Sequence, residues 1–224
     1  MLGPRMALLV CFVAALPIIA ACGRQRPAMD KGSTVATVSA GTKEKEVPKK
    51  RDVPLPPGDF RTAHWGDSKA AVKELEDAKL TADAPDGLAY AGKVAGLDAG
   101  IVYQFADDKL VAGGYVIEGK HANANIFIDE CNELRALLRE KYGKPTSDKM
   151  VWRDDLYKND PSSWGIAVGS GRLSYFTEWQ TPETKINLAL SGDNFKVNFV
   201  LRYGSKKYQG LFEATDKKRK LREL

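Results

Sequence analysis

The fold is decided by residues 185–201, which read KINLALSGDNFKVNFVL. Apolar residues mostly alternate with polar ones in 185–190 and again in 196–201, a period of two that is typical of antiparallel strands with one buried face. Residues 191–194, Ser-Gly-Asp-Asn, separate the two runs and predict a turn. We therefore expect strands at 185–190 and 195–203 that are joined as a hairpin.

Further strands are expected upstream of this hairpin. Asp107 and Asp108 tolerate turn geometry, so residues 106–109 predict the turn of a second hairpin. Residues 181–184 predict the turn into the strand at 185–190. The other predicted strands lie at 88–97, 101–105, 110–117, 150–152 and 173–180.

The longest predicted helix carries an apolar stripe with spacings of four, three and four residues. Gly143 and Pro145 mark its end, because glycine accepts the left-handed conformation and proline prevents continuation. The stripe consists of Phe127, Cys131, Leu134 and Leu138, and is widened by Ile128 and Leu137.

A shorter helix is predicted at 68–77, with Asp67 or Ser68 as its cap and with Val72 and Leu75 facing inward. Helix and strands are thus followed by helix and strands again. This order predicts an α+β domain with helices packed on an antiparallel sheet. It suggests two tandem helix-plus-sheet units that share one core.

The chain begins with features of an exported protein. Arg5 precedes an apolar stretch at 6–19 and the small residues Ala20 and Ala21, which is the pattern of a secretory signal peptide. The apolar stretch has 14 residues, whereas a helix needs about 20 to cross a bilayer. We therefore predict that residues 1–21 are a signal peptide and not a transmembrane helix.

Residues Ile19-Ala20-Ala21-Cys22 resemble the lipobox of bacterial lipoproteins, although that pattern more often has Leu in the place of Ile19. The resemblance implies cleavage before Cys22, a diacylglyceryl group on its sulfur and often a fatty acyl chain, such as palmitate, on its nitrogen. Two or more acyl chains hold a protein firmly at a membrane that it does not span. Gly23 follows, where an Asp would retain an enterobacterial lipoprotein in the inner membrane. The resemblance therefore implies a periplasm-facing protein of the outer membrane.

Three segments follow the predicted signal peptide. Residues 22–58 contain five prolines and no apolar periodicity, so we expect the lipidated N-terminus and a disordered tether. The 36 residues after Cys22 would span roughly 30–36 Å as a flexible coil. Residues 59–204 have the size of one globular domain, and residues 205–224 form a basic tail.

The charge is distributed unevenly among these segments. Tether and tail each carry a net charge of +4, whereas residues 59–204 contain 18 basic and 22 acidic residues. We therefore expect no nucleic-acid partner for the domain, and basic arms of this kind suit anionic membrane headgroups. The tail at 217–222 leaves two alternatives open, a grip on lipid phosphates and a disordered solubilising end.

The start of the domain carries a second, shorter resemblance. Phe60 is followed by Gly66-Asp67-Ser68 and by Val72 in the predicted helix. This pattern is similar to the first motif of small α/β envelope proteins, among them assembly lipoproteins of the BamE kind and tandem β-lactamase-inhibitor proteins. Asp67 departs from it, because those families often carry Met there. The resemblance implies a binding module, although a fold does not by itself establish a function.

The sequence does not predict an active site. His64 and His121 lack the spacing of a zinc site. His64 is either a structural or solvent-exposed residue or a catalytic base. Gly169-Ser170-Gly171 lacks the strand-to-helix context of a nucleophile elbow; it follows an expected strand at 166–168 and predicts a hairpin turn. Residues 154–160 are either a calcium loop without the EF-hand glycine and glutamate or an acidic surface loop. We expect no catalytic residue, cofactor or metal.

Cys131 is the thiol that remains once Cys11 leaves with the signal peptide and Cys22 is lipidated. Its place on the apolar stripe predicts a small buried hydrophobic residue. The alternative is a reactive or intermolecular thiol.

Together these features predict a lipid-anchored envelope lipoprotein whose domain binds or scaffolds another envelope component without enzymatic activity. Its expected partners are the membrane, through the lipid, and another envelope protein or polymer. Two alternatives stay open. One is an anchored hydrolase with an unrecognised active site, using His64 or an Asp/Glu pair, and the other is a carrier of lipid or a small ligand with a pocket on the sheet.

Overall fold

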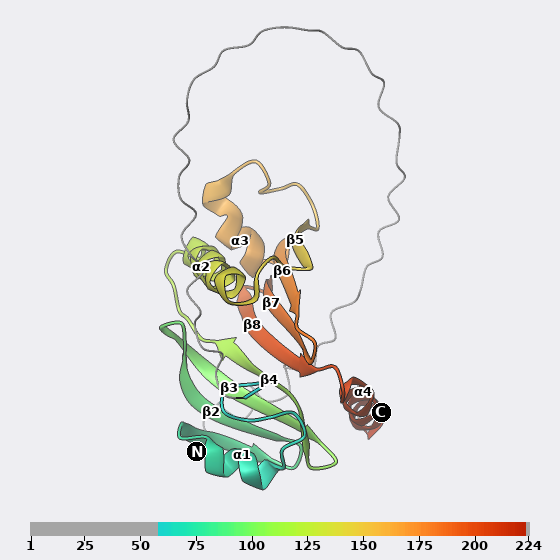
Figure 1. Ribbon diagram of the computed structural model, residues 1–224. Helices are drawn as coiled ribbons and strands as arrows, with labels where there is room; N and C mark the ends of the chain where they lie inside the picture. The colour runs from blue at the N-terminus through green and yellow to red at the C-terminus, as the bar shows by residue number, and fades with distance from the viewer. Residues whose placement is uncertain (1–57, 223–224) are drawn as a thin grey trace, which may run out of the picture.

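One antiparallel sheet of eight strands organises residues 58–222, the part of the chain that the computed structural model describes. Four α-helices pack against this sheet within the same residues, which confirms the predicted α+β class (Figure 1). The elements are α1 (Lys69–Leu75), β1 (Lys79–Ala84), β2 (Gly87–Val94), β3 (Leu97–Ala106), β4 (Lys109–Ile117), α2 (Asn125–Tyr142), β5 (Ser147–Trp152), the 3-10 helix η3 (Pro161–Ser163), α3 (Trp164–Gly169), β6 (Leu173–Gln180), β7 (Thr184–Asp193), β8 (Lys196–Ser205) and α4 (Gln209–Arg222).

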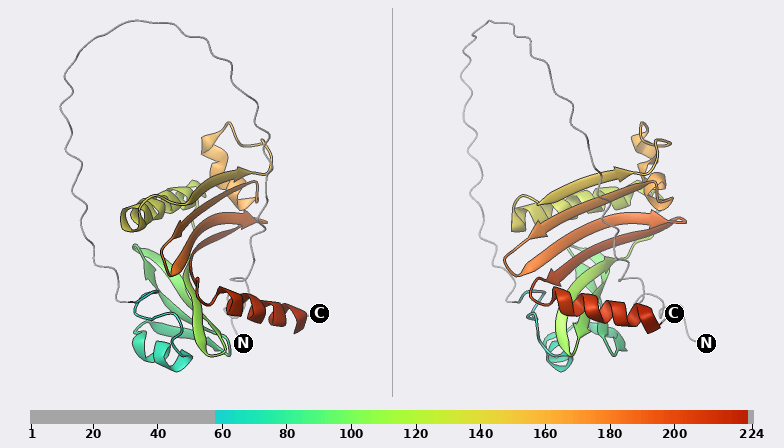
Figure 2. Two further views of the ribbon diagram at one scale, coloured as in Figure 1. Left: turned by 45° about the vertical axis from the view of Figure 1, so that its right-hand side comes forward. Right: turned by 90° about the vertical axis from the view of Figure 1, so that its right-hand side faces the viewer.

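The two halves of the sheet meet at one pair of strands. The strand order is β1-β2-β3-β4-β8-β7-β6-β5, so β1–β4 lie on one side and β5–β8 on the other. β4 pairs with β8 from Ala112 opposite Gly204 to Val116 opposite Val200. The strands of the two halves run at a steep angle to each other (Figure 2), as expected when strand twist accumulates over a wide sheet. The β4–β8 ladder is the seam between the halves.

The hairpin of β7 and β8 confirms the predicted alternation but not the predicted turn. Its buried residues include Ile186, Leu188, Leu190, Phe199 and Leu201. Asp193 pairs with Lys196, so the turn consists of Asn194 and Phe195, with φ of 48° and 60°. The turn predicted at 191–194 was wrong because Ser191 and Gly192 continue the ladder opposite Asn198 and Val197.

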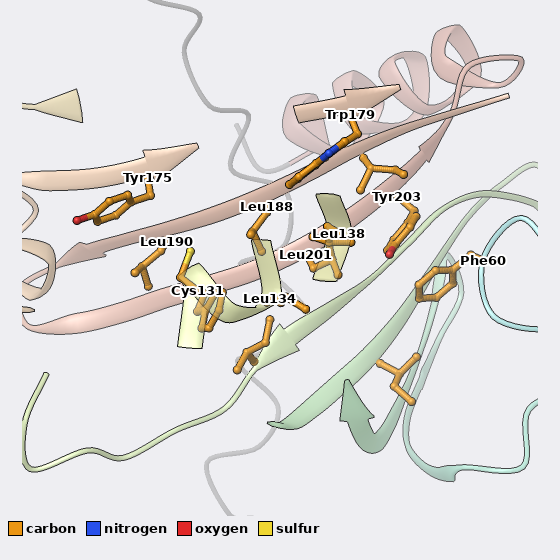
Figure 3. Packing of buried hydrophobic residues seen from close by; sticks show 14 of the residues in the cluster. Phe60, Cys131, Leu134, Leu138, Tyr175, Trp179, Leu188, Leu190, Leu201 and Tyr203 are labelled. Carbon is orange, nitrogen blue, oxygen red and sulfur yellow. The ribbon is translucent and has the colours of Figure 1, made fainter. Parts of the chain in front are cut away.

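α2 supplies the predicted apolar stripe. Its buried residues are Phe127, Ile128, Cys131, Leu134 and Leu138. Figure 3 shows Cys131, Leu134 and Leu138 beside strand residues such as Leu188 and Leu201. Gly143 ends the helix with a φ of 81°, as predicted. Leu137 does not widen the stripe: it is 44% exposed, because it lies about 100° around the helix from Leu138.

Residues 166–168 are helical, contrary to the predicted strand. They belong to α3, whose Ala167 and Val168 are buried in the core. The Ser170 N–H bonds to the Ile166 carbonyl at 2.9 Å, and Gly171 has a φ of 75°. Residues 169–171 therefore lead from a helix into β6 and are not a hairpin turn. A short apolar run such as 166–168 fits a helix and a strand equally well by periodicity.

The first half of the sheet differs from expectation in three places. β1 was not predicted, because it is an edge strand without a buried residue and therefore lacks an apolar period. The strand predicted at 88–97 divides at Ala95 and Gly96 into β2 and the start of β3. The short helix begins after Ser68, which accepts the Ala71 N–H as its cap, and Val72 is buried as predicted. Leu75, however, is 44% exposed.

The basic C-terminal segment contains a helix, so the disordered alternative does not describe residues 209–222. α4 contacts β3 and β4. The Arg202 guanidinium lies 4.6 Å from the centre of the Phe212 ring. On β8, Arg202 alternates with the core residues Leu201 and Tyr203, so it faces the other side of the sheet. α4 therefore packs on the face away from α2, as Figure 2 shows.

Phe60 fills the seam between the halves on the core face. Its ring centre lies 5.2 Å from that of Tyr103 on β3, and 5.3 Å from those of Tyr115 on β4 and Tyr203 on β8. A Cβ atom at Gly113 would collide with the Phe60 ring. β4 therefore needs glycine at this position so that one aromatic side chain can contact both halves.

A buried ion pair holds the end of α1 against β3. Arg61 binds Glu76 with two hydrogen bonds of 2.7 and 3.0 Å, and the Tyr103 hydroxyl and the Ala78 N–H also donate to this carboxylate. The Glu76 side chain is only 2% exposed. Burial raises the pKa of Glu76, and the hydrogen bonds from Arg61, Tyr103 and Ala78 lower it. Together the hydrogen bonds outweigh burial, so the pKa lies below its ordinary value.

The packing of α2 predicts a steep difference between neighbouring positions. Leu134→Ala should lower the free energy of unfolding by about 2–5 kcal/mol, because it leaves a cavity, and Cys131→Ala by about 1 kcal/mol. Leu137→Ala, the matched control on the exposed side, should stay within about 0.5 kcal/mol. The measurement is urea unfolding of the chain from residue 22 with Cys22→Ser. A Leu134→Ala variant as stable as Leu137→Ala would contradict this orientation, as would rapid thiol labelling of Cys131 before denaturant is added.

The Arg61–Glu76 pair predicts a pH dependence with a defined sign. Because folding lowers the pKa of Glu76, its contribution is present above the ordinary value of 4.5 and is lost as the pH falls through the lowered pKa. Glu76→Gln should cost about 1–3 kcal/mol at pH 7, since buried donors lose their charged acceptor. Below pH 4.5 the variant should also lose less stability than the parent does, because it lacks the carboxylate that becomes protonated. Unfolding curves between pH 3 and pH 7 measure both, and Glu74→Gln on the exposed side of α1 should behave as the parent does.

Candidate functional site

The sheet has an outer face that α2 and α3 do not cover. Buried and half-buried residues alternate along β6, β7 and β8, and the buried set points toward the core. The other set forms the outer face. An antiparallel sheet with one solvated face normally carries polar residues there.

One row across this outer face is apolar over six neighbouring strands. The strand registers place Ala91 opposite Gly100, Gly100 opposite Val116, and Val116 opposite Val200. Val200 in turn lies opposite Ala189, and Ala189 opposite Phe176. All six residues keep part of their surface in solvent. We call this set the apolar row: Ala91, Gly100, Val116, Val200, Ala189 and Phe176.

A second row beside it contains a half-buried cation. Arg202 lies opposite Gly114 on one side and Asn187 on the other, and Asn187 lies opposite Glu178. The Phe212 ring of α4 covers the Arg202 guanidinium, and burial lowers the Arg202 pKa. Its Nε has no hydrogen-bond partner among the described residues. α4 therefore shields the charge next to the apolar row.

Small side chains make the apolar row accessible to another backbone. Five of the six residues are Gly, Ala or Val, and Phe176 provides one large half-exposed ring at the β6 end. Contiguous exposed apolar surface marks interaction sites, whereas single exposed apolar residues need no explanation. The arrangement can bind a partner surface, and it brings no acid, base or nucleophile together.

The two histidines lie apart from this face in unrelated contacts. His64 is an exposed residue whose Nδ1 lies 3.6 Å from Asp59 Oδ2, and its backbone N–H bonds to Asp67. His121 Nε2 lies 3.0 Å from Glu130 Oε1 and packs against the Phe127 ring. No hydroxyl or thiol contact of either ring occurs among the described residues. Among the described contacts, His64 therefore has no nucleophile beside it of the kind that a hydrolase would need.

The three carboxylates of the acidic loop at 154–160 all bind side chains in or near the loop. Asp154 pairs with Arg172, Asp155 with Lys158, and Asp160 accepts hydrogen bonds from Ser162 and Ser163. Hydrogen bonds from these serines lower the pKa of Asp160. Within residues 58–222 no group of three or more His, Cys, Asp or Glu side chains is arranged to hold a metal ion.

Of the candidate cysteines, only Cys131 lies in the described part of the chain. It is a buried free thiol, 3% exposed, and burial raises its pKa to about 12. This agrees with the small hydrophobic residue that the sequence predicts, because a reactive thiol needs a lowered pKa. Cys22, the lipobox and the signal peptide lie outside the described residues.

Comparisons with known proteins identify no family for this chain. No family model, no curated protein and no solved structure matches it. Among residues 58–222, no helix combines the length and apolar character needed to cross a membrane.

Proposed function

We propose that the protein is a lipid-anchored envelope lipoprotein whose domain binds another envelope protein without catalysis, through the outer face of its sheet. The apolar row is the observation that carries this proposal, because six half-exposed apolar residues in register form one contiguous surface. The similarity of residues 60–72 to small envelope binding proteins supports the same function. The histidines and the carboxylates of the 154–160 loop bind neighbouring side chains, which favours a binding function over a hydrolase.

The lipid anchor rests on the lipobox at Ile19-Ala20-Ala21-Cys22. A diacylglyceryl group on Cys22 would hold the chain at a membrane, and the residues up to 58 would let the domain search for its partner. Gly23 favours the outer membrane, with the domain facing the periplasm. The basic side chains Lys217, Lys218 and Lys220, exposed on α4, suit the headgroups of a nearby anionic leaflet.

The order of elements supports an interpretation as two tandem helix-plus-sheet units. α1 precedes β1–β4, and α2 and α3 accompany β5–β8. The last strands of the two sets, β4 and β8, are the ones that pair at the seam. In this interpretation the outer face is a composite surface, since Val116 comes from one unit and Val200 from the other.

The anchor is tested by removing its attachment atom. Cys22→Ser should abolish acyl labelling, block lipoprotein-type processing and move at least about nine-tenths of the protein out of the membrane fraction, because the lipid supplies the membrane affinity. The parent should fractionate with outer-membrane markers on a sucrose gradient. Acyl labelling that survives in Cys22→Ser would refute the lipobox assignment, and fractionation with inner-membrane markers would refute the proposed location.

The docking surface is tested by photo-crosslinking from the apolar row. A photoreactive phenylalanine derivative in place of Phe176 should crosslink to one protein in cells of the native organism. The product should contain that protein and this chain in a one-to-one ratio. Adding Val200→Asp should lower the yield about tenfold, because a charge in an apolar interface must be desolvated. Leu137→Asp, on the exposed side of α2, is the matched control and should leave the yield unchanged. Equal yields in the two Asp variants would rule out this face, provided that both variants melt as the parent does.

A further inference from the structure

A groove runs along the edge of the sheet on the face opposite the apolar row. Its volume is about 370 Å³, within the range of about 300–1,000 Å³ that is usual for small-ligand sites. Its lining residues come from α2, α3, β5 and β6, and it is open to solvent. The lining residues are Ile128, Asn132, Arg135, Asp148, Met150, Trp164 and Tyr175.

One end of the groove is apolar except for the hydroxyl of Tyr175. Trp164 stands edge-on to Trp152, with ring centres 5.8 Å apart, and Met150 is 40% exposed although it lies on a strand. The Tyr175 hydroxyl is buried without a hydrogen-bond partner among the described residues. Burial, followed by the nearby Cys131, raises the pKa of Tyr175 to about 12, so this hydroxyl is a protonated donor.

At the other end, two arginines share one carboxylate, which leaves one surplus positive charge when Arg139 at the rim is included. Arg135 lines the groove, and Arg139 lies beside this end, outside the lining. Both bind Asp148, at 3.1 and 2.5 Å, and the Thr177 hydroxyl donates to the same carboxylate. Arg135 also donates to the Asn132 side chain at 2.7 Å. Each guanidinium has five N–H donors, so both keep donors that Asp148 does not use. Two cations that share one carboxylate suit a single additional anion with planar geometry.

The arginine end and the tryptophan end of the groove are separated along β5. Asp148 binds the arginines, and Trp152 lies beside Trp164 at the opposite end. These two strand residues are four positions apart on β5, which corresponds to about 13 Å. The Gly165 N–H bonds to the Asn125 side chain at 2.5 Å, which fixes α3 at the start of α2 and keeps Trp164 at that end.

We propose that this groove binds a medium-chain fatty acid or a similar linear carboxylate. The carboxylate would accept hydrogen bonds from Arg135 in the groove and from Arg139 at its rim, and the chain would lie along Met150 and Ile128 toward Trp164. One surplus charge matches a monoanionic carboxylate better than a dianionic phosphate. This site goes beyond the proposed docking function and is independent of it, because it lies on the other face of the sheet.

Decanoate is a suitable probe, since Trp152 and Trp164 report binding by fluorescence. With the chain from residue 22 carrying Cys22→Ser, decanoate should bind saturably below its micelle-forming concentration. Decanol, with the same chain and no charge, should bind about tenfold more weakly, and Arg135→Gln should cause a similar loss for decanoate. Asp148→Asn should tighten decanoate binding about threefold or more, because it removes the competing carboxylate. A purely structural role of Asp148 would not produce this gain.

Two neighbouring residues on β5 provide the matched control. Met150 and Val151 are each 40% exposed and point to opposite faces of the same strand. Met150→Gln should weaken decanoate binding, whereas Val151→Gln should not. Phenylacetate, which has the same head on a short flat body, should bind more weakly than decanoate. The proposal is overturned if decanoate does not saturate, if decanol binds as tightly, or if Arg135→Gln and Asp148→Asn leave its affinity unchanged.

Discussion

The whole sheet depends on the seam between β4 and β8 and on the aromatic ring that fills it. Five residue pairs join the two strands, and Phe60 contacts aromatic rings on both sides of them. β4 carries two successive glycines at this point. Gly113 leaves space for Phe60 on the core face, and Gly114 lies opposite Arg202 on the outer face. Glycine weakens a strand interior in general, and here the close packing of Phe60 compensates for that cost.

Elements with a strong apolar period could be predicted from the sequence, and those fixed by tertiary contacts could not. α2 and the strands β6, β7 and β8 each bury a regular set of residues, so their positions follow from periodicity. β1 buries nothing and gives no such signal. Polarity predicts that Leu75 is buried and Glu76 exposed, but the structure shows the reverse. Glu76 can be buried because Arg61, fifteen residues earlier, provides a partner for its carboxylate. A contact of this kind has no signature in the local sequence.

The two candidate binding surfaces show the same limit. In residues 198–201 polar and apolar residues alternate until Val200, which stands where the alternation predicts a polar residue. This apolar residue was the signal in the sequence of an apolar outer face. The apolar row itself, however, exists only through the registers of six strands. Likewise, Arg135 and Arg139 stand on an ordinary exposed helix side until β5 brings Asp148 beside them. The net charge of residues 59–204 is negative, yet the groove has a local cationic end.

The two surfaces share one strand without sharing area. Tyr175 and Phe176 are neighbours on β6, and the first lines the groove while the second belongs to the apolar row. A partner on the outer face therefore leaves the groove open. Energetic coupling between them would need a second arrangement of β6 that one ligand prefers. β6 keeps an unbroken register with β5 from Ser147 to Trp152 and with β7 from Lys185 to Leu190. A strand fixed on both sides in this way favours two sites that act independently.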